Sequence, residues 1–312
     1  MNLPSDITFR IPATSAILGP GFDIFGLALN LYSYFNLSFT FENKFDIFHS
    51  VSGQKIDIPE KSNLLRKAFI HALGKKPAPG IKMLFHSELP ASSGFGSSAS
   101  AIVAGVAAAN YFLKANNQSE FSLQDEINMI TELEGHPDNV CPARIGGFVF
   151  SSIQNDGNIL NIKKKIPENL GLALIIPHYR VSTKKSRSKL PRKYEINQVL
   201  SNISGAIHWM EYLNTGNIQN LLNAIHSDKI HEPYRLKNIP GYKKMVSEIK
   251  NLGCYGATIS GSGPGILVYY PGEIYDSLKS VLETTVVKAL SLKNSSNSVV
   301  FCKPDYEGLA VV

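Results

Sequence analysis

The chain has 312 residues, of which 44% are hydrophobic and 18% charged, a balance that is typical of a globular protein and excludes a disordered one. The 31 Lys and Arg residues exceed the 25 Asp and Glu residues and give a formal net charge of +6, which suits small anionic substrates as well as nucleic acid. The basic cluster from Lys184 to Lys193 contains no aromatic residue, so it does not resemble a surface on which single-stranded bases stack.

The first half of the chain mixes strand and helix patterns. Residues 7–11 alternate weakly and residues 22–41 are rich in Phe, Tyr and Leu, which predicts a short strand followed by paired strands. Residues 81–89 alternate as a strand, and residues 97–114 form an alanine-rich run without proline that predicts a helix. A second helix is expected over residues 122–134, which begin with a capping serine.

The second half shows a similar mixture after a polar stretch at residues 154–169. Further strands are expected at residues 146–153, 172–176, 257–260, 265–270 and 298–302. Further helices are expected at residues 195–213, 216–226, 242–252 and 274–290. We place a domain boundary in the polar stretch, which gives units of residues 1–165 and 166–312, and the mixture predicts an α+β fold for both.

The cysteines and the apolar segments indicate the cellular compartment in which the protein is expected to work. Cys141, Cys254 and Cys302 are far apart and odd in number, so we expect buried thiols rather than disulfides or a zinc site. The first residues lack the basic start and apolar run of a signal peptide, and apolar windows such as residues 102–111 are too short to span a bilayer. We therefore expect a cytoplasmic protein with neither membrane nor nucleic acid as a partner.

The strongest chemical signal is LPASSGFGSSASA at residues 89–101, where a strand runs through a glycine-serine loop into the alanine-rich helix. Small residues let backbone N–H groups approach an anion, and the helix points its positive end at the same place. The loop lacks the GxxxxGK[ST] of a P-loop, and Gly94 and Gly96 do not complete a GxGxxG pattern. A plain tight turn is the alternative, but the flanking serines favour a phosphate site.

Two acidic motifs flank this loop in the sequence. IPATSAILGPGFDIFG, at residues 11–26, turns sharply and delivers Asp23, which either caps the turn or belongs to a site. TELEGHPDNVCPARIGG, at residues 131–147, ends a helix that delivers the paired acids Glu132 and Glu134, and the loop after it is expected to expose Asp138 and Asn139. Paired acids beside a phosphate loop suit a hard divalent cation, and a solvated helix end is the alternative.

The second half contributes another glycine-serine loop and two arginine-bearing segments. YGATISGSGPGILVYY, at residues 255–270, is expected either to pack against the first loop or to form a simple hairpin. TKKSRSKLP, at residues 183–191, and HEPYR, at residues 231–235, each offer an arginine. A guanidinium grips a carboxylate with two parallel hydrogen bonds, which a lysine cannot do.

Taken together, these segments resemble the GHMP small-molecule kinase superfamily and, within it, the homoserine kinases. The order PATSA with LGPGFD, then P.SSG.GSSA, then SGSGP.I marks the superfamily, and EGHPDNV, the threonine-to-arginine stretch and HEPYR point to homoserine kinases. The resemblance covers the chain from about residue 11 to residue 270. It implies a two-domain fold, an N-terminal ribosomal-protein-like βαβ domain and a C-terminal ferredoxin-like α/β sandwich.

The resemblance also implies the activity. ATP would be the cosubstrate, Mg²⁺ the metal, and L-homoserine the acceptor that becomes O-phospho-L-homoserine in threonine biosynthesis, with a homodimer as a compatible assembly. The implied nucleotide-binding residues are Pro90, Ala91, Ser92, Ser93, Gly94, Phe95, Gly96, Ser97, Ser98 and Ala99, with Gly261, Ser262 and Gly263 from the second loop. For the metal, Ser98 and Glu132 are the matching residues, and Glu134 is the reserve.

The same resemblance assigns the acceptor end of the site. Asp23 and Asn139 would hold the amino and hydroxyl ends of homoserine, Arg187 and Arg235 would bind its carboxylate, and Thr183 would lie near the reacting phosphate. An asparagine side chain is too weak a base to take the hydroxyl proton, so we expect transfer without a strong protein base, with the phosphate taking the proton itself.

One position departs from the family pattern. The family usually reads S-A-N-L-G, with an asparagine that helps to bind substrate, whereas this chain has Ile17. Other kinases of the superfamily, acting on mevalonate or a sugar, therefore remain alternatives, as does a ligand sensor that has lost catalysis. A nucleic-acid-binding protein would show affinity that falls steeply with salt.

Overall fold

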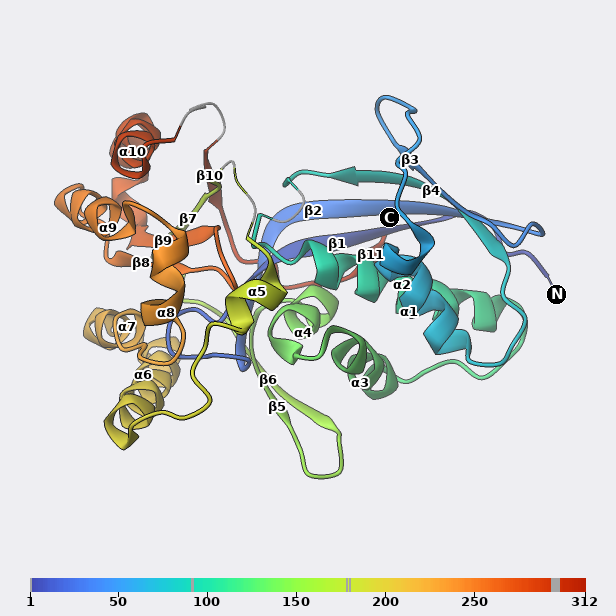
Figure 1. Cartoon of the computed structure of the whole chain (residues 1–312), viewed down its shortest axis with the longest axis horizontal. Helices are drawn as coiled ribbons and strands as arrows, with labels where there is room; N and C mark the ends of the chain where they lie inside the picture. Colours follow the sequence, from blue (N-terminus) through green and yellow to red (C-terminus); the bar gives the residue numbers. More distant parts are fainter. Residues whose placement is uncertain (1, 91–92, 178, 180, 293–297) are drawn as a thin grey trace.

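The computed structural model describes residues 2–90, 93–177, 179, 181–292 and 298–312. These residues form two β-sheets, one of seven strands and one of four, each packed against helices (Figure 1). The expected α+β class and two-domain architecture are therefore confirmed.

The first sheet has the strand order β11-β1-β2-β4-β3, with β5 paired to β2 and β6 paired to β5. Its strands are β1 (Ile7–Ala16), β2 (Phe25–Thr40), β3 (Phe45–His49), β4 (Gly80–Ser87), β5 (Phe148–Ile153), β6 (Ile159–Lys164) and β11 (Ala310–Val311). The prediction of paired strands over residues 22–41 is wrong, because that stretch forms the single 16-residue strand β2. It contains no proline and no Asn-Gly or Gly-Gly turn at which a hairpin could fold back.

Four helices cover one face of this sheet. They are α1 (Leu64–Leu73), α2 (Ser97–Ala115), α3 (Leu123–Glu134) and α4 (Pro137–Ile145), preceded by the short 3₁₀ helix η1 (Glu60–Ser62). Because α2 is rich in alanine, it fits deep in the layer and is buried on most of its surface. Ser122 caps α3 through a reciprocal capping box with Asp125, as the expected N-cap requires.

The second sheet is antiparallel and lies between two helical layers. Its strands, in the order β10-β7-β9-β8, are β7 (Leu170–Ile175), β8 (Gly256–Ile259), β9 (Ile266–Pro271) and β10 (Val299–Cys302). One layer consists of α6 (Ile196–Thr215) and α7 (Ile218–Ile225), and the other of α9 (Tyr242–Asn251) and α10 (Tyr275–Leu290). The short helices of this half are α5 (Thr183–Arg187), α8 (Glu232–Arg235), η2 (Leu236–Asn238) and η3 (Gly272–Ile274).

The alternation of β7 explains the two layers. Leu172 and Leu174 pack into the core that contains Trp209 of α6, whereas Ala173 and Ile175 pack into the core that contains Met245 of α9. A strand with apolar side chains on both faces is covered on both faces. Among the described helices, none combines the length and hydropathy needed to cross a membrane.

The chain passes from the first sheet to the second between β6 and β7. The first six strands of the first sheet end at Lys164, and the second sheet begins at Leu170. The last strand, β11, returns to the first sheet, where Val311 pairs with Phe9 of β1. The end of the chain therefore belongs to the first sheet, although it follows the second in sequence. The division at residue 165 stays a prediction.

Candidate active site

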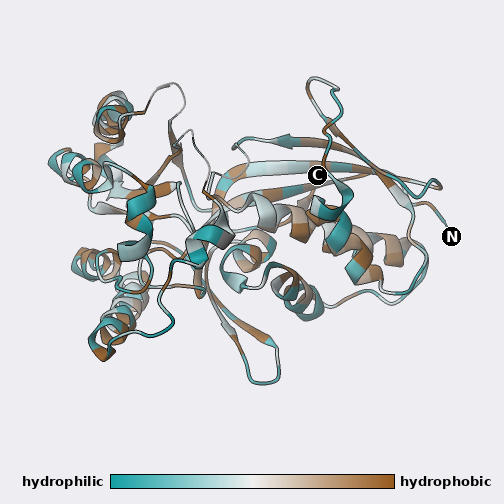
Figure 2. Cartoon of the chain, viewed as in Figure 1, coloured by the Kyte–Doolittle hydropathy of each residue, from teal (hydrophilic) through white to brown (hydrophobic). Residues whose placement is uncertain are grey.

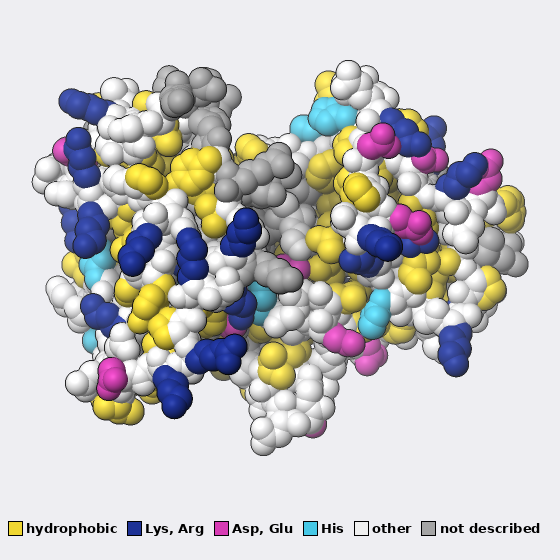
Figure 3. Space-filling model, in the orientation of Figure 1, with side chains coloured by type: hydrophobic (Ala, Val, Ile, Leu, Met, Phe, Trp, Pro, Cys, Tyr) yellow, Lys and Arg dark blue, Asp and Glu magenta, His cyan; other side chains and the backbone are white. Residues whose placement is uncertain are grey.

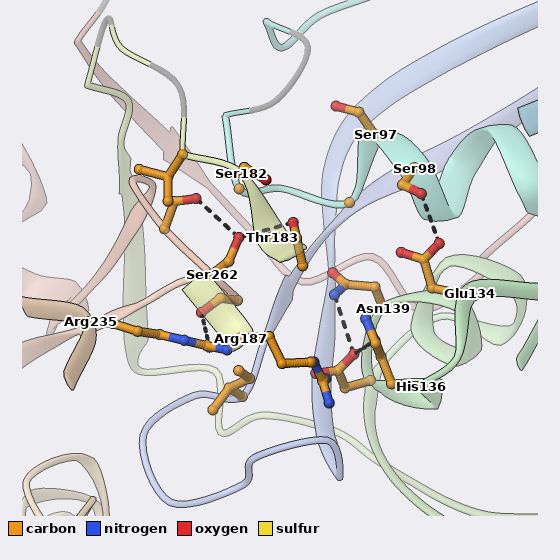
Figure 4. A pocket seen from close by; sticks show the side chains of 17 residues that line it. Ser97, Ser98, Glu134, His136, Asn139, Ser182, Thr183, Arg187, Arg235 and Ser262 are labelled. Carbon is orange, nitrogen blue, oxygen red and sulfur yellow. Dashed lines mark hydrogen bonds and ion pairs between the residues drawn. The ribbon is translucent and has the colours of Figure 1, made fainter. Parts of the chain in front are cut away.

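A cavity of about 240 Å³ opens where the two halves of the molecule meet (Figure 4). Its walls come from the glycine-serine loop and α2, from the junction of α3 and α4, and from three segments of the second half. The lining residues are Ile17, Gly94, Gly96, Ser97, Ser98, Glu134, His136, Asp138, Asn139, Val181, Ser182, Thr183, Arg187, Arg235, Gly261, Ser262 and Gly263. Residues far apart in sequence thus share one polar pocket.

The glycine-serine loop reaches this pocket through its glycines. Gly94 and Gly96 have φ angles of 91° and 77°, and a Cβ on Gly96 would lie 2.1 Å from Thr14 Oγ1, so only glycine fits there. Helix α2 begins at the next residue, Ser97, so its unpaired N–H groups and positive end lie beside the pocket. This geometry suits a phosphate group.

The predicted nucleotide residues divide into two groups. Gly94, Gly96, Ser97 and Ser98 line the pocket, as do Gly261, Ser262 and Gly263 of the second loop. Pro90, Ser93, Phe95 and Ala99 do not line it, and Ala91 and Ser92 lie outside the described residues. Phe95 and Ala99 are instead buried in the two cores, which anchors the loop.

The second glycine-serine loop packs against the first. Ser260 Oγ donates a hydrogen bond to the Gly94 carbonyl at 2.7 Å, and the Gly261 N–H donates to the Ala16 carbonyl at 3.0 Å. The loop also joins β8 to β9 as a hairpin. Both sequence-based expectations for this segment hold together, because the hairpin turn is the part that contacts the first loop.

Glu134, rather than Glu132, faces the phosphate loop. Ser98 Oγ donates to Glu134 Oε2 at 2.7 Å, whereas Glu132 is exposed and lies 3.7 Å from His71 (Figure 4). Residues two apart on an α-helix point to nearly opposite sides, so α3 brings only one of the two acids to the pocket. The choice of Glu132 is therefore corrected. Burial raises the pKa of Glu134, and its hydrogen bond with Ser98 opposes that shift.

Asp138 and Asn139 lie in the first turn of α4 rather than on an exposed loop. Pro137 occupies the first turn, where proline favours helix initiation, and Asp138 is buried. His136 Nδ1 lies 2.6 Å from Asp138 Oδ1, and Thr14 Oγ1 donates to Asn139 Oδ1 at 2.8 Å. The expectation of an exposed Asp-Asn pair is wrong for Asp138, because the helix turns its side chain inward.

Charge around His136 affects its protonation. Burial lowers the pKa of His136, but its hydrogen bond with Asp138 and the charges of Asp138, Glu134 and Asp23 outweigh burial, and its pKa is raised. One ligand atom each of Asp23, His136 and Asp138 lies within 4.8 Å of the others. Three titratable groups therefore gather beside the pocket, and two of them, His136 and Asp138, line it.

Asp23 does not itself line the pocket, but it forms a bidentate ion pair with Arg187, which does. Both terminal nitrogens of Arg187 donate to the two carboxylate oxygens of Asp23, at 2.8 and 2.5 Å. The guanidinium carbons of Arg187 and Arg235 lie 5.0 and 5.3 Å from the centre of the Phe22 ring. The hydrogen bond with Asp23 raises the pKa of Arg187. Two arginines from different segments therefore converge on one aromatic ring.

Arg235 is buried and only partly paired. Its Nη1 donates to the Gly261 carbonyl at 2.8 Å, and its Nε has no hydrogen-bond partner among the described residues. Burial, and after it the charge of Arg187, lower the pKa of Arg235 to about 10. A buried guanidinium with spare donors is suited to an anionic ligand.

The segment that carries Arg235 is fixed by Asp228. Asp228 Oδ2 accepts the N–H groups of His231 and Glu232 at 3.2 and 2.6 Å, and Asn202 Nδ2 donates to Oδ1 at 2.7 Å. Asp228 thereby caps α8, on which Arg235 lies. It was not among the residues selected from the sequence, although an aspartate shortly before Pro233 is a helix-start signal.

The rim of the pocket is formed by hydroxyl groups. Thr183 Oγ1 lies 3.2 Å from Ser262 Oγ (Figure 4). Ser186 Oγ donates a hydrogen bond to the Ser262 carbonyl at 3.3 Å. The start of α5 is thus held against the second glycine-serine loop. Ser182 and His136 also line the pocket, and Thr14 donates a hydrogen bond to Asn139 there, but none of the three was selected from the sequence.

Ile17 forms an apolar part of the wall. It is buried, and its φ of 75° lies in the left-handed region that β-branched residues avoid. Its N–H donates to the Phe25 carbonyl at 2.7 Å, and its own carbonyl accepts the Gly21 N–H at 3.0 Å. These hydrogen bonds hold a backbone conformation that asparagine adopts more easily.

The surface charge is distributed rather than concentrated. In Figure 3 the Lys and Arg side chains spread over the left half of the visible face, where the second sheet and its helices lie, without forming one continuous stripe. Among the residues that the structure describes, this face shows no concentrated basic track of the kind that backbone binding to nucleic acid uses.

Comparison with known proteins identifies the family. The model of the GHMP kinases N-terminal domain matches residues 63–147, and that of the GHMP kinases C-terminal domain matches residues 209–283. The homoserine kinase of Aquifex aeolicus is 34% identical over 83% of this chain and 85% of its own length. That of Caldicellulosiruptor saccharolyticus is 33% identical over 98% of this chain and 96% of its own. The crystal structure of homoserine kinase from Cytophaga hutchinsonii superposes with a TM-score of 0.82 at 25% identity, covering 100% of this chain and 99% of that one. This chain belongs to the GHMP kinases, together with the homoserine kinases that it resembles along most of its length.

Proposed function

We propose that this chain, an ATP-dependent small-molecule kinase like its family, transfers the γ-phosphoryl group of ATP to the side-chain hydroxyl of L-homoserine. The product would be O-phospho-L-homoserine, an intermediate of threonine biosynthesis. The observation that carries the substrate assignment is the convergence of Arg187 and Arg235 beside an acidic group, Asp23, at one end of a phosphate pocket. An α-amino acid presents the complementary charges, a carboxylate and an ammonium.

The phosphate end of the pocket fits Mg²⁺ as well as ATP. Ser98 and Glu134 offer a hydroxyl and a carboxylate at the start of α2, oxygen ligands of the kind that Mg²⁺ prefers. When bound there, the ion would neutralise charge on the phosphate groups. The backbone N–H groups of the glycine-serine loop and of the first turn of α2 would hold the transferred phosphate, with Thr183 at the rim.

At the acceptor end, the Asp23–Arg187 pair would open to receive the substrate. The substrate carboxylate would bind Arg187 and Arg235, its ammonium would bind Asp23, and Asn139 would orient its hydroxyl. The hydroxyl oxygen forms a bond to the γ-phosphorus while the bond to the ADP oxygen breaks. Asn139 is not basic and Asp23 would be occupied by the substrate ammonium, so the hydroxyl proton would pass to an oxygen of the transferred phosphoryl group.

Mevalonate is the second candidate acceptor, because Ile17 supplies an apolar wall and mevalonate also carries a carboxylate. It lacks the ammonium that Asp23 would bind. We further propose that the chain works in the cytoplasm as a homodimer. The three cysteines, all buried and unpaired, support a reducing compartment.

Replacing Arg235 by leucine tests the substrate assignment. We expect Arg235→Leu to raise the KM for homoserine roughly 10- to 100-fold, the usual cost of a hydrogen bond to a charged group, while the KM for ATP changes little. Arg66→Leu, on α1 and remote from the pocket, serves as the control for removal of an arginine. Equal losses for homoserine and ATP would sink the carboxylate-binding role.

A further inference from the structure

The side-chain amide of Asn139 is held at both of its ends. Thr14 Oγ1, on β1, donates a hydrogen bond to Asn139 Oδ1 at 2.8 Å. Asn139 Nδ2 donates to Asp138 Oδ1 at 3.3 Å, and His136 Nδ1 lies 2.6 Å from the same carboxylate oxygen. An ionised carboxylate only accepts hydrogen bonds, so the amide nitrogen is the atom beside Asp138 and the amide oxygen is the atom beside Thr14. The two contacts therefore fix the direction in which the amide faces.

Thr14 also contacts the phosphate loop. Its N–H donates a hydrogen bond to the Phe95 carbonyl at 3.3 Å. Its hydroxyl lies against Gly96, where a Cβ would be only 2.1 Å from Thr14 Oγ1. Through its backbone and its side chain, Thr14 thus joins the loop that would hold ATP to Asn139, the residue that would hold the acceptor hydroxyl.

An irregularity of strand β1 accompanies this placement of Thr14. Phe9 and Ile11, two positions apart, pack into the core beneath the helices of the first sheet. Strict alternation would give the same direction to Ala13, yet it is the Thr14 hydroxyl that reaches α4. The register of β1 against β2 shifts between Pro12 and Ala13. Such shifts re-aim side chains and are frequent beside active sites.

Burial makes the contact between Thr14 and Asn139 necessary. Thr14 is fully buried, and Figure 2 shows brown, hydrophobic segments on the helices that cover the first sheet. A buried hydroxyl without a partner is costly, and Asn139 is the partner of the Thr14 hydroxyl among the described residues. Asp138 takes one of the two N–H groups of Asn139 Nδ2, which leaves the second available on a side chain that lines the pocket (Figure 4).

We propose that Thr14 is a positioning residue of the phosphoryl transfer, because it holds Asn139 with one N–H group available to the oxygen of the acceptor hydroxyl. When that oxygen accepts from Asn139, the hydroxyl proton has to point elsewhere, towards the phosphoryl oxygen that would take it. The acceptor oxygen then forms its bond to the γ-phosphorus while the bond to the ADP oxygen breaks. The inference rests on the proposed function, since it requires the acceptor hydroxyl to bind at Asn139.

Steady-state kinetics of Thr14→Val tests this role, because valine keeps the shape of threonine and removes its hydroxyl. We expect kcat to fall roughly 3- to 10-fold, the effect of one net hydrogen bond, with the KM values for homoserine and ATP changed less than about 2-fold. Thr14→Ser retains the hydroxyl and should restore kcat. Thr8→Val, the control on the same strand, removes a hydroxyl that accepts from Asn36 at 2.8 Å and should leave kcat unchanged. Wild-type kcat in Thr14→Val, or an equal loss in Thr14→Ser, overturns the proposal.

A double-mutant cycle tests whether Thr14 acts through Asn139. Asn139→Ala removes the amide itself, so adding Thr14→Val to Asn139→Ala should lower kcat no further. The same fold loss from Thr14→Val in both backgrounds would show that Thr14 acts by another route and would overturn the proposal. Should Thr14→Val not fold, Thr14→Ala removes the same hydroxyl without adding a methyl group and replaces it in the cycle.

The wild-type assay separates this inference from the proposed function. A wild-type chain that does not phosphorylate homoserine contradicts the proposed function, and the variants are then measured with the acceptor that the chain does phosphorylate. Wild-type transfer to homoserine that Thr14→Val leaves unimpaired contradicts the role of Thr14 alone.

Discussion

The acidic and basic groups at the acceptor end are already paired with one another before any substrate binds. Asp23 gives both of its carboxylate oxygens to Arg187, and Arg235 uses one nitrogen on the Gly261 carbonyl. A zwitterionic substrate can replace these partners one for one, its carboxylate taking the place of Asp23 on Arg187 and its ammonium that of Arg187 on Asp23. The site is thereby preorganised for an amino acid without leaving charges unpaired.

This pairing predicts the effect of removing Asp23. Asp23→Ala should raise the KM for homoserine about 10-fold or more and lower kcat by less, because the ammonium loses its partner. Steady-state kinetics with homoserine varied at saturating ATP measures both constants. Asp46→Ala, on β3, removes an exposed ion pair with Lys55 and should change neither constant. A fall in kcat with unchanged KM would point to Asp23 as a base instead.

Ile17 offers a second test at the scale of one residue. Ile17→Asn replaces an apolar side chain in the pocket wall by an amide that can form hydrogen bonds. The left-handed backbone conformation at this position is one that asparagine tolerates. We expect the KM for homoserine to fall roughly 2- to 10-fold, the contribution of one net hydrogen bond, with the KM for ATP unchanged. Ile17→Leu supplies no amide and should show no such gain. An unchanged or raised KM in Ile17→Asn speaks against Ile17 as a determinant of the acceptor pocket.

Helix α8 positions Arg235, and the stability of the fold around it depends on the protonation of Glu232, a half-buried acid at the start of that helix. Glu232 Oε1 accepts the Ile259 N–H at 2.9 Å, and burial raises the pKa of Glu232 to about 8. In an unfolded chain the pKa of a glutamate is about 4.3, so between pH 4.3 and 8 the native state binds more protons than the unfolded state. Stability therefore falls as the pH rises through this window.

Replacing Glu232 by glutamine should remove this pH dependence. Glutamine keeps the carbonyl oxygen that accepts the Ile259 N–H but carries no charge. We expect Glu232→Gln to raise the melting temperature by roughly 2–6 °C at pH 8.5 and to leave it nearly unchanged at pH 4.5. Thermal unfolding at the two pH values provides the measurement, and Glu248→Gln, at an exposed position of α9, is the control. A variant less stable than wild type at pH 8.5 contradicts a destabilising buried carboxylate.

At the scale of elements, the sequence predicted what is local. Helices α2 and α3 follow from composition and capping, and the strand-loop-helix around Gly94 follows from its glycines and serines. Which of Glu132 and Glu134 points at the start of α2 depends on the rotation of α3 about its own axis, and only the packing of α3 against α2 determines that rotation. Helix α4 was missed for a different reason, because His136 and Pro137, which suggested a loop, are its N-cap and its first residue.

At the scale of the whole molecule, the site consists of contacts that sequence spacing cannot show. Arg187 reaches Asp23 across 164 positions, and Ser260 reaches Gly94 across 166. Before the structure, only the resemblance of the motifs to a known family indicated that these segments belong to one site. The pairing of β11 with β1 was not predicted, because a strand of two residues is too short to show an alternating sequence pattern.

The central claim is that the chain phosphorylates the hydroxyl of L-homoserine with ATP. The most direct measurement incubates the purified chain with ATP, Mg²⁺ and L-homoserine and follows the products by phosphorus NMR and mass spectrometry. Parallel reactions contain mevalonate, galactose, or a chelator in place of free Mg²⁺. We predict equal amounts of ADP and of a phosphomonoester on the homoserine side chain, with little product from mevalonate or galactose and none with the chelator. ATP consumption without phosphorylated homoserine, or faster phosphorylation of mevalonate or galactose, would contradict the account.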